Sequence, residues 1–319
     1  MTAHGPTHSC KGLGRAIVFS LYSNTQPCSH YSCGQGVIRR FIKERATFMD
    51  TTKLLSKADP HCTIMAVEGL DGSGKSTLVG YLKQQVESED TSKLYTNLKR
   101  RPRVKVLPIL GEDDYFYDRL HALEGTDYKK GEKGIDVSDT NLAQAVLDAT
   151  NRTMHQVVPE LSHYYDLIIL DRSRASFNAY QLHMHQLTEY RQAWLDSIQK
   201  DYELLGPVRA IYLSASTALR ARLLSTRSSL DDLDQMSLKH EHALLAGMNE
   251  YFSELCARYC PADQDDETAP KNLIVDMDKL FKSNNDPEQC LKVIYEAFVA
   301  NWMFKVAASV VIRSLTTVQ

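Results

Sequence analysis

The sequence predicts an α/β fold in which a parallel five-stranded sheet carries helices on both faces. Three observations lead to this prediction. Short apolar runs rich in β-branched residues alternate along the chain with longer segments of helical periodicity. A glycine-rich turn connects the first apolar run to a helical segment, and a later apolar run ends in a carboxylate. Both features belong at the carboxyl ends of parallel strands, where open α/β sheets bind their ligands.

The first strand is expected at residues 63–68 and the first helix at 74–88, on either side of the glycine-rich turn. A basic stretch with no acidic residue from Thr91 to Gly111 leads into the second strand, expected at 104–109. Acidic residues follow immediately, so we interpret the basic stretch as a solvated loop rather than a nucleic-acid patch. Residues 125–137, rich in Gly and Lys, are expected to form a loop.

The middle of the chain is expected to form a helix, a strand and a second helical segment. A long helix is expected at 139–163, because apolar residues recur there at helical spacing and Ser138 is suited to cap the first turn. The run 166–171 is short, apolar and closed by Asp171, which favours a buried strand. Residues 173–204 have a mostly helical pattern.

The C-terminal third is expected to contain two strands and three helices, and the pair Gly206-Pro207 interrupts the chain before the first of them. The strands are expected at residues 208–213 and 272–277, and the helices around Leu219 and Leu223, at 234–259 and from Pro287 onward. An acidic loop at 263–270 precedes the last strand. This alternation completes the five-stranded parallel sheet.

The composition excludes several classes of function. The chain has 319 residues and a net charge of −3, which gives it no general affinity for polyanions, and we expect no nucleic-acid partner. Seven cysteines, scattered from Cys10 to Cys290, do not form a secreted disulfide framework and fit a reducing compartment. The most apolar stretch, Val293–Ile312, contains charged and amide side chains, so we expect an amphipathic closing helix and no membrane partner.

The expected domain organisation is an N-terminal extension at residues 1–60, a globular domain at 61–305 and a short tail at 306–319. The first 43 residues carry five basic and no acidic side chains, together with many Ser, Gly and His. This composition fits a disordered extension, and it also fits an organellar transit peptide. We therefore expect a cytoplasmic protein, with a mitochondrial location as the alternative.

The turn after the first strand has the spacing Gly-x-x-x-x-Gly-Lys-Ser of a P-loop, which ends in Lys75 and Ser76. Its glycines let backbone N–H groups turn toward phosphate oxygens, and the helix presents its positive end to them. Lys75 would reach the β- and γ-phosphates, and Ser76 would offer its hydroxyl to Mg²⁺. The residues expected to bind ATP are Gly69, Gly72, Ser73, Gly74, Lys75, Ser76 and Thr77. A plain glycine turn is the alternative, and it leaves the Lys-Ser pair unexplained.

Asp171 ends the third strand and is followed by Arg172. A carboxylate at this position would orient Mg²⁺-bound water or the attacking phosphate oxygen, which makes Asp171 a candidate for the metal site together with Ser76. Its alternative role is to cap the next helix. Crowded phosphate charge also requires fixed cations besides Mg²⁺, and Lys75 is a candidate for one of them.

Residues 68–77, Glu-Gly-Leu-Asp-Gly-Ser-Gly-Lys-Ser-Thr, closely resemble the P-loop of the thymidylate kinase family. Three later stretches resemble motifs of this family in the same order, at residues 149–152, 171–181 and 220–235. The resemblance extends over most of the chain, about residues 62–300. It implies a P-loop kinase fold with a small lid at about residues 222–233. It also implies a nucleoside monophosphate kinase that uses Mg²⁺ and ATP and forms a homodimer.

By this resemblance, residues from several motifs would hold the acceptor nucleotide. Arg172 would bind its phosphate, Arg152 would hold the nucleotide, and Asp71 would accept a hydrogen bond from its 3′-hydroxyl. The side chains that would border its base and sugar are Ser176, Tyr180 and Gln181. In the lid, Arg227 would stabilise the migrating phosphoryl group, because Gly72 stands where the family can carry an arginine in the P-loop.

Two departures from the family pattern leave the substrate open. The Arg-Glu-Pro stretch expected after the second strand is absent, and residues 107–111 stand in its place. Asp148 occupies the position of the aromatic residue that stacks on thymine, four residues before Arg152. The expected reaction transfers the γ-phosphoryl group of ATP to a (deoxy)pyrimidine monophosphate, with dTMP as the first candidate. The alternatives are a UMP/CMP-type kinase, a deoxynucleoside kinase and a nucleotide-binding regulator without turnover.

Overall fold

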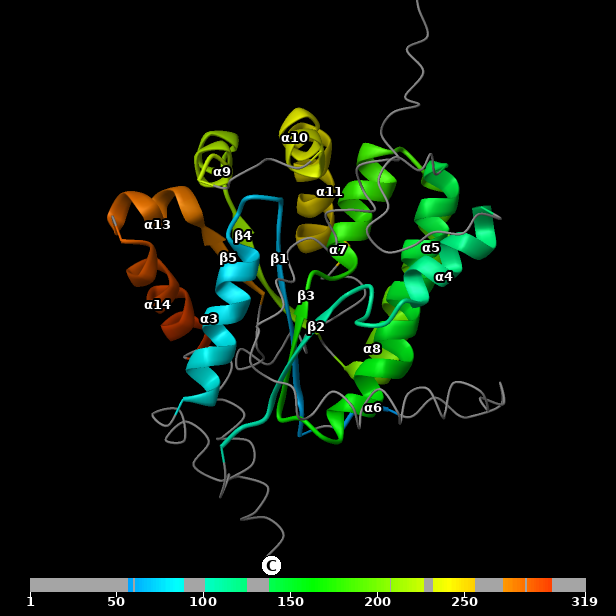
Figure 1. The fold of residues 1–319 in the computed structure, drawn as a ribbon, viewed down its shortest axis with the longest axis horizontal. Coiled ribbons are helices and arrows are strands. Elements are labelled where there is room, and N and C mark those ends of the chain that lie inside the picture. Colours follow the sequence, from blue (N-terminus) through cyan, green and yellow to red (C-terminus); the bar gives the residue numbers. More distant parts are fainter. Residues whose placement is uncertain are drawn as a thin grey trace, which may run out of the picture.

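A computed structural model describes residues 57–59, 61–88, 101–124, 138–206, 208–226, 232–255, 272–284 and 286–299 of the chain. Its centre is a five-stranded, all-parallel sheet with helices on both faces (Figure 1). The strands are β1 (Thr63–Gly69), β2 (Val104–Pro108), β3 (Leu167–Asp171), β4 (Arg209–Ser214) and β5 (Leu273–Asp276). The predicted α/β class and all five strands are confirmed, and each strand end lies within one residue of its expected position.

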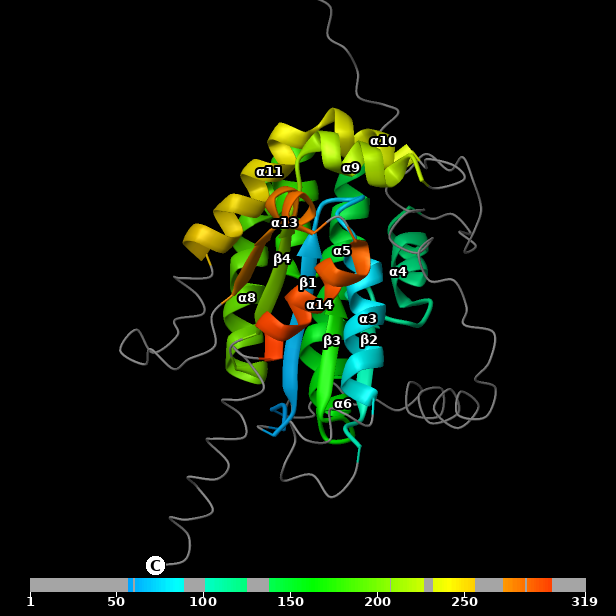
Figure 2. The same cartoon turned by 90° about the vertical axis from the view of Figure 1, so that its left-hand side faces the viewer.

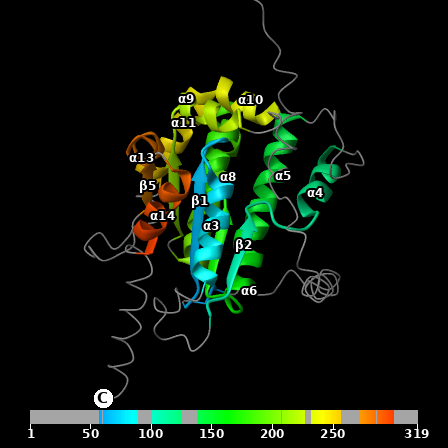
Figure 3. The same cartoon turned by 60° about the vertical axis from the view of Figure 1, so that its left-hand side comes forward.

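Two groups of helices cover the two faces of the sheet (Figures 1 and 2). One face is covered by α3 (Lys75–Glu87), α13 (Met277–Ser283) and α14 (Pro287–Phe298). The other face is covered by α5 (Asp139–Arg152), α6 (Val158–Ser162), α7 (Arg174–Phe177), α8 (Arg191–Leu205) and α11 (Glu241–Glu250), and α4 (Tyr115–Glu124) packs against α5. Figure 3 shows α14 beside α3, where the rings of Tyr81 and Tyr295 meet edge to face.

The strand order β2-β3-β1-β4-β5 places β1 at the centre of the sheet, between β3 and β4. The chain leaves β1 toward one face through α3 and leaves β3 toward the other face through α7. Two helices, α9 (Thr217–Leu224) and α10 (Asp232–Lys239), lie beyond the carboxyl ends of these strands (Figure 2). The loops after β1 and β3 therefore lie side by side at the edge where ligands bind in such sheets.

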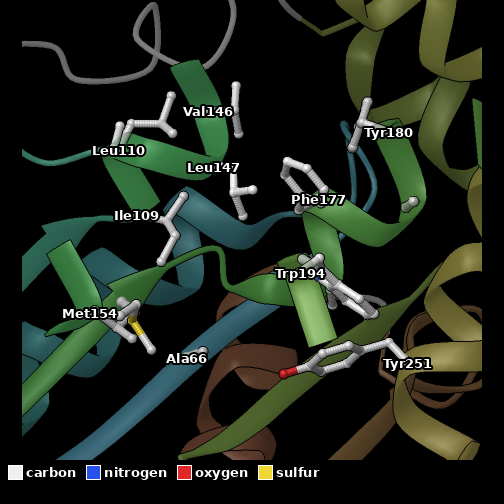
Figure 4. Packing of buried hydrophobic residues seen from close by; sticks show 14 of the residues in the cluster. Ala66, Ile109, Leu110, Val146, Leu147, Met154, Phe177, Tyr180, Trp194 and Tyr251 are labelled. Carbon is white, nitrogen blue, oxygen red and sulfur yellow. The ribbon is translucent and has the colours of Figure 1, made fainter. Parts of the chain in front are cut away.

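Strand β1 is buried on both faces, and its side chains alternate between two cores. Ile64 and Ala66 belong to the core beneath α5 and α8, and Met65 and Val67 belong to the core beneath α3. Figure 4 shows part of the first core around Ala66. The same alternation places the next charged residue, Glu68, on the face of the first core, where it is completely buried.

Three of the expected helical segments are interrupted. The helix expected at 139–163 contains a π-helical turn, η2 (Thr153–Val157), just before Pro159, which has no N–H for the α-helical pattern. The segment 173–204 consists of α7, the π-helix η3 (Asn178–Met184), the 3-10 turn η4 (Thr188–Tyr190) and α8. In the segment 234–259, α10 ends at Lys239, α11 begins at Glu241, and η5 (Tyr251–Leu255) follows. Helices α4 and α13 were not predicted, since ten and seven residues give little periodic pattern.

Several expectations concern residues outside the described ranges. These are the extension before residue 57, the loop at 125–137, the acidic loop at 263–270, Arg227 with the centre of the expected lid, and the tail at 306–319. Within the described part of the chain, no helix is long and apolar enough to cross a membrane.

Candidate functional site

The loop between β1 and α3 lies at the carboxyl edge of the sheet and depends on its glycines. Gly69, Gly72 and Gly74 have φ values of 149°, 80° and 93°, which residues with a Cβ rarely adopt. A Cβ on Gly69 would lie 2.8 Å from the carbonyl oxygen of Leu213, and one on Gly72 would lie 2.7 Å from Cγ of Leu224. The loop is therefore packed against β4 and α9, and Leu224 excludes a longer side chain at position 72.

Lys75 is the first residue of α3, and its side chain is buried inside the loop. Its Nζ donates a hydrogen bond to the Leu70 carbonyl at 3.0 Å and lies 3.8 Å from Oδ1 of Asp71. Burial, and then the charge of Arg172, lower the pKa of Lys75 to about 8 against the opposing effect of Asp71. The expected phosphate-binding ammonium therefore lies at a helix N-terminus, inside a glycine loop.

The N-terminus of α3 has no side-chain cap. Gly74 occupies the N-cap position, so the first-turn N–H groups are left to an external acceptor. The side chains of Ser76 and Thr77 are exposed on this turn. Ser73 is buried, and its Oγ has no hydrogen-bond partner among the described residues. Four of the residues expected to contact ATP, Gly74, Lys75, Ser76 and Thr77, thus belong to a helix end without a side-chain cap.

Asp71, Arg172, Ser176 and Tyr180 form one buried group, which we call the Asp71 cluster. Arg172 donates from Nη2 to Oδ1 of Asp71, and from Nη1 to the Ser176 hydroxyl at 3.3 Å. The Tyr180 hydroxyl donates to Oδ2 of Asp71 at 2.5 Å, and the Arg172 guanidinium lies 5.7 Å from the Tyr180 ring centroid. Four residues expected to face the acceptor are therefore connected by direct contacts.

The charges of the Asp71 cluster stabilise one another. Burial alone would raise the pKa of Asp71, but the charges of Arg172 and Lys75 and the hydrogen bonds from Tyr180 and Arg172 together outweigh burial and lower this pKa to about 2. Burial also opposes the charge on Arg172, and Asp71 together with the other acidic groups around it more than offsets burial, so the pKa of Arg172 is raised. Burial, and then the charge of Asp71, raise the pKa of Tyr180. At neutral pH the cluster therefore contains a fixed ion pair and a neutral phenol.

Arg172 has a left-handed backbone with a φ of 74°, and among the described non-glycine residues only Gln186 shares a positive φ. Its N–H donates to the carbonyl of Val67 in β1 at 3.1 Å. This turn directly after β3 brings the guanidinium to Asp71 in the loop after β1. Strained backbone conformations of this kind concentrate at functional sites.

Glu68 is a residue of this site that the sequence patterns did not identify. It is fully buried, and it accepts hydrogen bonds from the Ser173 N–H at 2.5 Å, the Ser173 hydroxyl at 2.8 Å and the Ser176 hydroxyl at 3.0 Å. Burial raises the pKa of Glu68, and the charge of Arg172 lowers it in part. Glu68 thereby joins the loop after β1 to the segment after β3. The alternation of side chains along β1 was the available signal.

Asp171 ends β3 opposite Val67 of β1 and is half-buried. Its negative charge opposes the lowering of the pKa of Lys75. Its alternative role as a helix cap is contradicted, since Ser173 caps α7 with its own hydroxyl. The described ranges contain no group of three or more His, Cys, Asp or Glu side chains that could hold a metal ion. Mg²⁺ held by one carboxylate, one hydroxyl and substrate phosphates needs no such group, so Asp171 and Ser76 fit the expected metal site.

Arg152 and Gln181 do not join the contacts of the Asp71 cluster. Arg152 ends α5, where its Nη1 pairs with Asp113 at 2.5 Å and its guanidinium lies 4.7 Å from the Tyr115 ring centroid. Its partners are therefore on the segment after β2. Gln181 is buried next to Tyr180 in sequence, and its Oε1 has no hydrogen-bond partner within the described part of the chain. The remaining expected residue, Arg227, lies outside the described ranges.

Asp148, at the position expected for a base-stacking aromatic residue, is held in an ion pair. Its Oδ2 accepts from Nε of Arg119 at 2.6 Å, and its Oδ1 accepts from the Gln144 amide at 2.8 Å. Gln144, Asp148 and Arg152 are spaced four residues apart on α5, so they share one face of this helix. This face is polar, and its ion pairs reach Arg119 of α4 and Asp113 before it.

No protein-family model matches the chain, and a comparison with curated proteins finds no match either. The functional interpretation therefore depends on the residues and contacts of the site itself.

Proposed function

We propose that the protein is a nucleoside monophosphate kinase of the thymidylate kinase type, with the P-loop kinase fold. It transfers the γ-phosphoryl group of ATP to a (deoxy)pyrimidine monophosphate, with dTMP as the first candidate. The observation that carries this proposal is the arrangement of two cations after adjacent strands. Lys75 follows β1 and Arg172 follows β3, and both lie against the carboxylate of Asp71. A donor phosphate at Lys75 and an acceptor phosphate at Arg172 would be neighbours.

The donor side of the site suits a triphosphate. It combines a glycine loop, an uncapped helix N-terminus and one buried ammonium group. With a pKa of about 8, Lys75 is mostly charged at neutral pH. Since Gly72 has no room for a side chain beside Leu224, we propose that Arg227 of the lid supplies the additional cation for the migrating group.

The acceptor side suits a monophosphate better than a nucleoside. A phosphate matches the planar fork of Arg172 and can accept two parallel hydrogen bonds from it. A nucleoside would bring no anion to this buried guanidinium. Asp71 and Tyr180 offer a carboxylate and a phenol, which are suitable partners for sugar hydroxyls. These contacts support a monophosphate kinase over a deoxynucleoside kinase.

In the proposed reaction the protein supplies positions and charges rather than covalent chemistry. Mg²⁺ bound with ATP would be held by Ser76 and Asp171 and would neutralise phosphate oxygens. Arg172 would hold the acceptor phosphate with one oxygen directed at the γ-phosphorus, and Lys75 would remain against the transferred group. The acceptor oxygen forms its bond to the γ-phosphorus as the bond to the β-phosphate oxygen breaks. ADP and a nucleoside diphosphate are then released.

A substrate panel tests this proposal. The purified protein is given Mg-ATP with dTMP, dUMP, CMP, UMP or thymidine, and the products are separated by chromatography. We expect a nucleoside diphosphate from at least one monophosphate and no phosphorylated product from thymidine. Product from thymidine alone would support a deoxynucleoside kinase. ATP binding without any product would support a nucleotide-binding regulator.

The Lys75→Ala variant tests the donor side. We expect its turnover to fall by at least about 10²-fold, because the ammonium stabilises the transferred phosphate in the transition state. Lys83→Ala removes an exposed lysine of the same helix and should keep the wild-type turnover. Circular dichroism shows whether both variants fold. Wild-type turnover in a folded Lys75→Ala variant would contradict the assignment of the phosphate loop.

A further inference from the structure

Arg220 of α9 is completely buried, and the proposed reaction gives it no role. Its Nε donates to the carbonyl oxygen of Asp71 at 2.8 Å. Its Nη2 donates to the Ser237 hydroxyl at 2.5 Å, and its Nη1 donates to Oε1 of Glu241 at 3.3 Å. The three acceptors belong to the loop after β1, to α10 and to α11. One guanidinium therefore joins three separate segments of the chain.

A closed ring of polar contacts passes through Arg220 and Asp71. Arg220 donates to the Ser237 hydroxyl at 2.5 Å, Ser237 interacts with Tyr180, and the Tyr180 hydroxyl donates to Oδ2 of Asp71 at 2.5 Å. Arg220 also holds the Asp71 carbonyl directly. The backbone and the side chain of Asp71 both depend on Arg220.

We propose that Arg220 is a positioning residue for the acceptor nucleotide, because it fixes Asp71 and thereby the guanidinium of Arg172. This inference rests on the proposed function. An arginine suits the position because its planar fork carries donors to three acceptors, whereas lysine has a single ammonium group on a flexible stem. Arg222 does not share this role, since it is exposed and its guanidinium lies 5.7 Å from the Phe281 ring centroid.

The ring acts on the acceptor side more than on the donor side. It ends at Oδ2 of Asp71, and the other oxygen of the same carboxylate, Oδ1, accepts from Arg172. Loss of the ring would let the carboxylate turn and would displace Arg172. Lys75 lies 3.8 Å from Oδ1 of Asp71, but it also donates a hydrogen bond to the Leu70 carbonyl, which the ring does not include. A loss of acceptor binding that is larger than the loss of ATP binding is therefore the signature of this role.

Ser237→Ala opens the ring and keeps the bond from Arg220 to the Asp71 carbonyl. We expect the KM for the acceptor to rise about tenfold, while the Kd for ATP, measured by calorimetry, stays within about threefold. Ser283→Ala is the matched control, since its exposed hydroxyl donates to the Lys279 carbonyl of α13 at 3.0 Å, and it should change neither value. Tyr180→Phe should raise the acceptor KM similarly, and the double variant should add little, as expected for members of one network.

Two results would overturn the proposal in this experiment. One is an acceptor KM in Ser237→Ala equal to that of Ser283→Ala. The other is a loss confined to ATP binding, which would place the effect of the ring on the donor side. Either result counts against Arg220 only if the wild-type protein turns over a monophosphate, so a second measurement that is independent of activity is needed.

Hydrogen–deuterium exchange provides this measurement. Arg220→Lys should accelerate amide exchange in the peptide that covers residues 69–75, because the Asp71 carbonyl loses its buried partner. Lys239→Ala removes an exposed cation of α10 and should leave this peptide unchanged. Unchanged exchange in a folded Arg220→Lys variant would overturn the positioning role, even in an active kinase. A wild-type protein without turnover would instead remove the proposed function, and the exchange result would still decide whether Arg220 fixes the loop.

Discussion

Arg172 is held in place through its backbone and through its side chain. A φ of 74° costs a non-glycine residue roughly 1–3 kcal/mol. The hydrogen bond from its N–H to Val67 and the buried bonds of its guanidinium to Asp71 and Ser176 offset this cost. Lysine would keep the charge but lose the fork that reaches both side chains. The position of the Arg172 guanidinium is therefore fixed by the protein itself, which would lower the entropy lost if a ligand bound to it.

The pKa of Lys75 predicts an upper pH limit for the use of ATP. Burial and the charge of Arg172 lower this pKa to about 8, so the ammonium loses its proton as the pH rises through 8. We expect kcat/KM for ATP, which reports the free enzyme, to fall above pH 8. The triphosphate favours the charged form, so kcat at saturating ATP should fall only at higher pH.

Steady-state kinetics between about pH 6.5 and 9.5 measure both quantities. Lys83→Ala should keep the wild-type profile, since Lys83 is exposed on the same helix. Lys75→Arg keeps its charge throughout this range, and whatever activity it retains should show no fall near pH 8. A kcat/KM that is flat across this range in the wild type would contradict the assignment of Lys75 to the donor phosphate.

At the residue scale, the resemblance to family motifs predicted which residues meet at the site, but it did not predict the residues that support them. The resemblance of the P-loop and of the stretch after Asp171 to those motifs implied the members of the Asp71 cluster, and the structure brings these side chains into contact. Glu68 and Arg220 were not identified as site residues. Their partners Ser173 and Asp71 are 105 and 149 residues away along the chain, and no local pattern encodes such a pair.

Helix α11 approaches the π-helix η3 closely because Gly247 has no side chain. A Cβ at this position would lie 2.6 Å from Cα of Ala179, the neighbour of Tyr180. This backbone atom cannot move without displacing η3. We expect Gly247→Ala to destabilise the protein by about 1–3 kcal/mol. Acceptor binding should also weaken, because Tyr180 moves with η3.

Gly80→Ala is the matched control for this element. Gly80 lies inside α3, and nothing lies within 4 Å of its added Cβ. Alanine should therefore stabilise the helix by up to about 1 kcal/mol. Urea unfolding measures both variants. Equal free energies of unfolding for Gly247→Ala and Gly80→Ala would contradict the close packing of α11 against η3.

At the scale of elements, the strands were predicted more closely than the helices. A buried parallel strand is a short apolar run between breaks, which the sequence displays directly. A π-helical turn has nearly the same spacing of apolar residues as an α-helix, so η3 was expected as ordinary helix. The π-helix η3 also makes contacts with other elements, such as the hydrogen bond from the Asn178 side-chain amide to the Gly247 carbonyl at 2.7 Å. Such tertiary contacts override local pattern.

Four elements of the molecule meet at a buried ionic group on the face of the sheet opposite α3. Arg174 donates to both carboxylate oxygens of Asp201 at 2.7 Å and to Asn151 at 2.8 Å, and His155 lies 2.9 Å from Asp201. Asp201→Asn would leave Arg174 buried without its anion, so we expect a loss of about 3–5 kcal/mol in the free energy of unfolding. Asp196→Asn, exposed on the same helix, should change it by less than about 0.5 kcal/mol.

The difference in the free energy of unfolding between the wild type and Asp201→Asn should become smaller at acidic pH. Burial would raise the pKa of Asp201, but the charge of Arg174 and the hydrogen bonds from Arg174 and His155 together outweigh burial, so this pKa is lowered from 3.8. A carboxylate with a lowered pKa stabilises the fold above its ordinary pKa, and this contribution is lost as the pH falls through the folded value. Urea unfolding at neutral pH and well below pH 3.8 measures the change. A difference independent of pH would contradict an ionised Asp201.

At the scale of the whole molecule, the sequence predicted the class of the fold but not the order of its strands. Alternating strands and helices predict a parallel sheet. They do not specify that β1 lies between β3 and β4, because this order depends on which face each connecting helix crosses. The order matters for the site, since it brings the loops after β1 and β3 together although about a hundred residues separate them.

The ion pair between Arg172 and Asp71 also affects which anions can bind to the Arg172 guanidinium. Inorganic phosphate could bind the Arg172 guanidinium only by displacing Asp71 from it. The buried carboxylate of Asp71 would then lose its closest counter-ion, and such a loss costs several kcal/mol. A ligand that carries both an anionic group for Arg172 and a hydroxyl group for Asp71 would give each of these two charged side chains a new partner. A nucleotide has this pair of groups on its sugar, so under the proposed function we expect inorganic phosphate alone to bind this site more weakly than a nucleoside monophosphate.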